Sequence, residues 1–182
     1  MGNDGVVPQA GTVRFERTVP GPVERVWAHL TDPELRATWL AGGITEPHVG
    51  GRIDHVFRVH ELVPAEPTPA EYAADVEHHR YGHVLVYDAP TRLAFTWVEA
   101  GHRESEVHIE LAPDTAVTLR LEHAHIPTRD ELVSVAAAWH THLDILEARL
   151  KNTVPESFWG SITRLQAHYE REIPAHLHPA HD

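Results

Sequence analysis

Histidine is the residue type in this chain with the widest chemical reach. The sequence has 17 histidines and no cysteine, so any chemistry must use imidazoles, carboxylates, hydroxyls or shape. His55 and His123 lie on the apolar side of two alternating segments, where a buried imidazole needs a partner or shifts to its neutral form. They are our candidates for orienting a ligand. The alternative, a core histidine bonded to backbone or to a hydroxyl, stays open.

Acid–base catalysis and metal binding are further uses of these side chains. An imidazole suits proton transfer at neutral pH, but no carboxylate partner can be named for either candidate. His123 and His125 form an H-x-H pair whose side chains are expected to point the same way on a strand, whereas His140 and His142 lie on nearly opposite sides of a helix. We predict no metal site and no cofactor.

Tryptophans from three predicted elements are expected to meet at one place. Trp39, Trp97 and Trp139 would form aromatic walls that favour a flat or ring-bearing ligand, while Trp27 and Trp159 suit core packing. The other candidate lining residues are Phe57, Phe95, Ser105, Leu119 and Leu121. A solid core in place of a pocket is the alternative.

Short alternating segments predict the strands that would carry these side chains. Apolar and polar residues alternate between turn-forming Pro, Gly and Asp residues, which is typical of half-buried strands. The connections among the last four segments are short enough to force antiparallel neighbours, so we expect a meander. The predicted strands cover residues 13–19, 51–59, 83–88, 92–98, 105–111 and 116–126.

Helical periodicity appears near the start and again near the end. Two short helices are expected, one with Pro22 in its first turn and one after Asp32, which is a good N-cap residue and is followed by Pro33 at the first helical position. A long helix is predicted over residues 130–151, and an extra amphipathic helix over 156–173. The apolar stripe of the long helix consists of Leu132, Val135, Ala136, Trp139, Leu143, Leu146 and Leu150.

These elements predict one domain of the α+β class over residues 13–173. Residues 1–12 are expected to be a flexible start and residues 174–182 a flexible tail. The stretch 61–80 breaks the pattern with three prolines, so we predict an insertion or lid there, with one or two helical turns between Ala70 and Val76 and solvated imidazoles at His78 and His79.

The charge balance restricts the partners. With 15 Lys and Arg against 27 Asp and Glu, the net charge of −12 repels nucleic acid and anionic membranes. The start lacks the pattern of a signal peptide and no segment could span a bilayer, so a cytoplasmic location is expected. The sequence leaves open whether the chain forms a homodimer.

Several segments resemble the START-like (SRPBCC) superfamily. They include VERVWAHLTDPELRATWL, GHVLVYDAPTRLAFTW, VTLRLEHAHIP and AAAWHTHLDILEARL, and the likeness is greatest to bacterial proteins similar to the C-terminal domain of the activator of the heat-shock chaperone ATPase. The resemblance implies a helix-grip fold, in which a curved antiparallel sheet wraps around a long C-terminal helix, here with an extra C-terminal helix. It also implies that a small hydrophobic or aromatic molecule binds in an internal cavity. An enzyme of the cyclase or dehydratase type using the cavity histidines, or a co-chaperone-like interaction module, are the alternatives.

Overall fold

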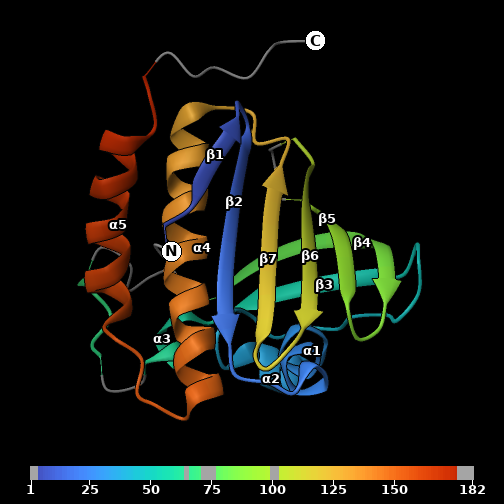
Figure 1. Cartoon of the computed structure of the whole chain (residues 1–182). Coiled ribbons are helices and arrows are strands. Elements are labelled where there is room, and N and C mark those ends of the chain that lie inside the picture. Colours follow the sequence, from blue (N-terminus) through green and yellow to red (C-terminus); the bar gives the residue numbers. More distant parts are fainter. Residues whose placement is uncertain (1–3, 64–65, 71–76, 99–102, 176–182) are drawn as a thin grey trace.

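The computed structural model describes residues 4–63, 66–70, 77–98 and 103–175. A seven-stranded antiparallel sheet curves around one face of a long helix, and the last helix packs on the opposite side of that helix (Figure 1). In chain order the elements are β1 (Val6–Gln9), β2 (Thr12–Val19), α1 (Val23–Thr31), α2 (Pro33–Ala37), β3 (Arg52–Phe57), α3 (Val59–Leu62), β4 (His78–Asp88), β5 (Arg92–Trp97), β6 (Ser105–Pro113), β7 (Val117–Ala124), α4 (Arg129–Lys151) and α5 (Phe158–Glu172).

The sheet order is β1-β2-β7-β6-β5-β4-β3, which confirms the predicted α+β fold and the meander from β4 to β7. The pairing of β2 with β7 brings the start of the chain next to its last strand. Trp97 on β5 lies opposite Ser105 on β6, and Val107 on β6 lies opposite His123 on β7. Adjacent positions on one face of neighbouring strands therefore carry the indole, the hydroxyl and the imidazole.

Helix α4 fills the concave side of the sheet. Its predicted apolar stripe turns inward, with Val135 half-buried and the other six members no more than 4% exposed. Thr128 caps the helix by accepting from the Glu131 N–H, and Asn152 ends it in the left-handed conformation. Burying one large aliphatic side chain contributes about 1.5–3 kcal/mol, so this stripe is the main attachment of the helix to the sheet.

The structure corrects two predicted boundaries. Residues 1–12, predicted to be a flexible start, contain β1, which extends the sheet beyond β2, and the Gly5 N–H donates to Tyr169 Oη of α5 at 2.7 Å. Strand β4 begins at His78, so the final residues of the predicted insertion belong to the sheet. The helical turns predicted near Ala70 to Val76 fall almost wholly outside the described residues.

The described part of the insertion is fastened to both C-terminal helices. The Glu66 carboxylate accepts from the N–H groups of Phe158 and Trp159, at 2.6 and 3.3 Å, and from the Ser157 hydroxyl. The Arg149 guanidinium of α4 donates to the Leu62 carbonyl at 2.7 Å. Glu66 thereby accepts from two of the N–H groups that a helix N-terminus leaves without intrahelical partners.

Within the described ranges, no helix has the length and apolar character to cross a membrane.

Candidate functional site

Six aromatic and imidazole rings gather beneath the N-terminal half of α4, with Trp97 at their centre. The centroid of the Trp97 ring lies 4.7 Å from that of His55, 5.7 Å from Trp139 and 5.9 Å from both His123 and Phe57. Phe95 lies 6.1 Å from Trp97 and 5.2 Å from His55. Such tilted and edge contacts are the favourable arrangements of ring pairs. We call these six residues the aromatic cluster.

One directional chain of hydrogen bonds crosses the aromatic cluster. The Trp139 indole N–H donates to His123 Nδ1 at 2.9 Å, so the ring proton of the neutral imidazole must be on Nε2. His123 Nε2–H then donates to Ser105 Oγ at 2.8 Å, and the Ser105 hydroxyl donates to the Trp97 carbonyl at 3.3 Å. Burial lowers the pKa of His123 to about 3. Its imidazole is therefore neutral, with both nitrogens engaged.

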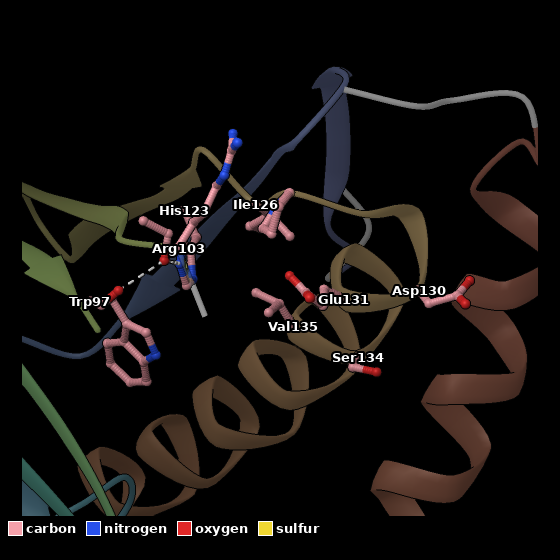
Figure 2. A pocket seen from close by; sticks show the side chains of 10 residues that line it. Trp97, Arg103, His123, Ile126, Asp130, Glu131, Ser134 and Val135 are labelled. Carbon is pink, nitrogen blue, oxygen red and sulfur yellow. Dashed lines mark hydrogen bonds between the residues drawn. The ribbon is translucent and has the colours of Figure 1, made fainter. Parts of the chain in front are cut away.

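Two adjoining pockets, which we call the outer and inner lobes of one cleft, lie between α4 and the sheet side of the aromatic cluster, and both reach the surface at Ser134. The lobes have volumes of about 280 and 250 Å³ and share Trp97, His123, Ser134 and Val135. Figure 2 shows the outer lobe, with Trp97 and His123 on the sheet side and Ser134 and Val135 on the helix side. The remaining lining residues are Arg103, Ser105, Ile126, Pro127, Asp130 and Glu131 in the outer lobe and Leu40, Phe57, Val59, His78, Arg80, Ala138, Trp139 and His142 in the inner lobe.

Charge is concentrated at the mouth of the outer lobe. Asp130, whose side chain is 96% exposed, and Glu131 lie on the first turn of α4, and Arg103 precedes β6 (Figure 2). The apolar lining of this lobe includes the side chains of Trp97, Ile126 and Val135. The cleft therefore combines an apolar interior with a polar entrance, which is the usual construction of a small-molecule site.

The predicted site residues fall into two groups. The structure brings together the six members of the aromatic cluster and Ser105, all of which had been predicted from strand or helix faces. The other three line neither lobe: Trp39 is fully buried with its indole N–H donating to the His29 carbonyl at 2.8 Å, and Leu119 and Leu121 are fully buried in the sheet core. His55 and Phe95 belong to the cluster but line neither lobe, and both rings lie against Trp97.

Two buried histidines of α4 were missed as candidates. His142 Nδ1–H donates to the Trp39 carbonyl at 2.7 Å and lines the inner lobe, and burial lowers its pKa to about 4. His140 faces α5, where its Nδ1 lies 2.9 Å from Tyr169 Oη, and burial lowers its pKa to about 4. Their opposite orientations were predicted. The predicted extra helix could have indicated that His140 is buried. An amphipathic helix that follows α4 must pack on a face of α4, and His140 lies on the face that α5 covers.

The loop beside Leu40 is held by a buried guanidinium. Arg36 is 1% exposed and donates to the carbonyls of Ala41, Gly42, Gly43 and Asp54 at 2.7–3.1 Å, and also to the Thr45 hydroxyl. Burial lowers its pKa to about 10, so it stays protonated at neutral pH. Gly43 has a φ of +96°, and a Cβ there would lie 2.5 Å from the Asp54 carbonyl oxygen. Arg36 and Gly43 together fix this wall of the inner lobe against β3.

The expected geometry of the H-x-H pair was wrong. Strand β7 ends at Ala124, and His125 has a φ of +65° and an exposed side chain, while His123 is 2% exposed. The two imidazoles consequently diverge. Over the described ranges, no group of three or more His, Asp or Glu side chains is arranged to hold a metal ion.

Comparison with known proteins places this architecture in a family. The family model described as "Activator of Hsp90 ATPase homolog 1-like protein" matches residues 20–151. The chain belongs to this family. The match confirms the resemblance seen in the sequence. Among functionally curated proteins, none matches.

Solved structures agree with the helix-grip fold. A Bordetella parapertussis protein solved by NMR is 36% identical, with a TM-score of 0.81 over 99% of this chain and 95% of that chain. The crystal structure of CalU16 from Micromonospora echinospora is 21% identical, with a TM-score of 0.66 over 92% and 93% of the two chains. A Rhodobacter sphaeroides protein is 22% identical, with a TM-score of 0.62 over 80% and 96%. At these two lower identities the likeness concerns the fold alone.

Proposed function

We propose that this protein binds a small, flat, mainly apolar molecule in the two-lobed cleft, with a ring of the ligand against Trp97. The observation that carries the proposal is that Trp97 is half-buried, lines both lobes and is surrounded by five other rings. Each lobe is slightly smaller than the lower limit of about 300 Å³ for ordinary ligand pockets. One lobe suits a fragment of one or two rings, and both together suit a larger molecule.

The energetics favour recognition by shape and ring contact. His123 and Ser105 are already paired within the protein, so they present little free hydrogen-bonding capacity to a ligand. An aromatic pair contributes about 0.5–1.5 kcal/mol beyond the burial of area. A two-ring ligand between Trp97 and Val135 would gain the free energy of burying its apolar area and, in addition, that of the ring contact with Trp97.

The test is a fragment titration on wild-type protein and on two tryptophan variants. Two-ring aromatic fragments are expected to shift the backbone amide signals of β5, β7 and α4 in wild type. Ser134→Trp places an indole at an exposed position shared by both lobes and should abolish those shifts. Gln166→Trp, at an exposed position of α5 away from the cleft, is the matched control and should bind as wild type does. Fragment shifts that survive Ser134→Trp unchanged would contradict binding in the cleft.

The catalytic alternative would require His123 to act in proton transfer. A cyclase or dehydratase would need an imidazole that exchanges a proton, whereas His123 is neutral, with a pKa near 3, and donates its only ring proton to Ser105. Turnover of a bound ligand that is lost in His123→Ala, at an unchanged melting temperature, would favour catalysis. A pull-down that retains the heat-shock chaperone would favour the co-chaperone role suggested by the family description.

A further inference from the structure

One buried polar atom beside the cleft has no partner. Four side-chain nitrogen or oxygen atoms of the described residues are buried without a hydrogen bond: Arg17 Nε, Arg17 Nη2, Asp144 Oδ1 and His55 Nε2. The first three belong to one ion pair, in which Arg17 Nη2 lies 3.5 Å from Asp144 Oδ1. His55 Nε2 has no such neighbour, and an unpaired buried polar atom costs about 1–3 kcal/mol.

His55 is separated from the cleft by a single layer of rings. Its side chain is 1% exposed, and its ring centroid lies 4.7 Å from that of Trp97 and 6.3 Å from that of Phe57. Trp97 and Phe57 both line the inner lobe and are both half-buried. A rotation of either side chain would therefore connect the lobe with the imidazole. Phe95 closes the other side of His55 at 5.2 Å and is 2% exposed, so the cleft side is the more accessible one.

The surroundings of His55 keep its imidazole neutral. Burial, and then the nearby Arg36 guanidinium, hold its pKa well below the usual value. A neutral imidazole has one nitrogen that donates and one that accepts. A hydroxyl group can do either, so it satisfies Nε2 in both tautomers. A phenolic hydroxyl is also uncharged at neutral pH, so its burial costs much less desolvation free energy than that of a charged group.

We propose that His55 Nε2 is the polar anchor of an inner subsite behind Trp97 and Phe57, and that the ligand class is a flat aromatic molecule with a ring hydroxyl. This inference rests on the proposed function, because the aromatic body of the ligand occupies the cleft. The hydroxyl passes the displaced ring and pairs with His55. The unsatisfied atom of the free protein is thereby satisfied only in the complex, which makes the hydroxyl a determinant of specificity.

The experiment compares three probes on the wild-type chain: naphthalene, 2-naphthol and 2-methoxynaphthalene. Dissociation constants come from amide chemical-shift titrations of the ¹⁵N-labelled 20.4 kDa protein. We expect 2-naphthol to bind about tenfold more tightly than naphthalene, the size of one well-formed buried hydrogen bond. The methoxy compound should lose most of this preference, because a methyl group replaces the hydroxyl hydrogen. The ether oxygen cannot donate a hydrogen bond, and the added methyl group crowds the subsite. Long-range ¹H–¹⁵N spectra should show the His55 ring nitrogens shifting with 2-naphthol and much less with naphthalene.

Two variants assign the preference to the imidazole. His55→Phe keeps a ring without its nitrogens, and it should raise the melting temperature while reducing the 2-naphthol preference to about one. The matched control Phe57→Leu changes the same layer but retains His55, so it should weaken both probes while keeping their ratio. The wild-type spectra decide the question even if His55→Phe does not fold.

The outcomes separate this inference from the proposed function. Equal affinities for naphthalene and 2-naphthol in the wild type, or a preference that survives His55→Phe, overturn the anchor and leave cleft binding intact. Absence of binding by all three probes overturns both. A higher melting temperature with an unchanged probe preference would show that His55 is only a buried core histidine.

Discussion

The buried imidazoles make the stability of this protein depend on pH in a way that can be calculated. His55, His123 and His142 are each at most 5% exposed, and burial is the largest cause of the lowered pKa of each one. In the unfolded chain the same groups titrate near 6.5. Between the two values the unfolded state binds more protons than the native state, so stability rises with pH there. The contribution is complete above about pH 7.5 and is lost as the pH falls through 6.5 toward the native values.

The magnitude follows from linkage. At pH 5.5 an unfolded histidine is about nine-tenths protonated, whereas His123 and His142, with native values of about 3 and 4, are almost unprotonated. His123 and His142 then each contribute a slope of about 1.2 kcal/mol per pH unit. His140, with a native pKa of about 4, adds about 1.2 more, which makes about 3.6 kcal/mol per pH unit for the three, and His55 adds to this slope in the same direction. That loss over one unit is a large part of the total stability of an ordinary domain, which is about 5–15 kcal/mol.

Urea denaturation at half-unit steps from pH 8 to 5 measures this slope. His142→Gln removes one titrating group while keeping a side-chain donor for the Trp39 carbonyl, so the slope at pH 5.5 should fall by about 1.2 kcal/mol per pH unit. His48→Gln replaces an exposed imidazole and should leave the slope unchanged. A stability that is flat from pH 7.5 to 5, or a His142→Gln slope equal to that of wild type, would refute the reasoning.

Three other predictions concern single contacts. Arg36→Met should lower the free energy of unfolding by about 3 kcal/mol or more, because the carbonyls of Ala41, Gly43 and Asp54 lose this donor, whereas that of Gly42 still accepts from the Val56 N–H; a loss below 1 kcal/mol in urea titrations would contradict this. Glu66→Ala should cost about 1 kcal/mol and speed amide exchange at the start of α5, with exchange in β7 as the unaffected reference. Trp139→Phe leaves His123 Nδ1 without its donor and should cost about 1–3 kcal/mol, and an unchanged urea midpoint would argue against that bond.

Strand alternation predicted which side chains face inward because it is a local property. His55, Phe57, Trp97 and His123 were all placed on the apolar side of their strands from sequence alone, and all belong to the aromatic cluster. The stripe of α4 was predicted for the same reason. The curvature of the sheet, which brings these faces together, was predicted only from the family resemblance.

The hydrogen-bond partners could not be predicted, because they depend on register between distant elements. Ser105 and Trp139 meet His123 only through the pairing of β6 with β7 and the position of α4 above them. Trp39 was expected in the cavity, but the bond from its indole to His29 turns it into the core. Strand β1 was missed because four residues that include a proline give too short a pattern.

The Arg36 loop also governs how this sheet meets other chains. An unpaired strand edge is a template for aggregation, and β3 would be such an edge. Gly42 and Thr45 instead form bridges to Val56 and Ile53 along it, and the buried guanidinium holds them there. The opposite edge, β1, is short and contains Pro8. Loss of Arg36 should therefore expose a strand that pairs with other copies, so the variant should precipitate at a lower temperature than the wild-type chain.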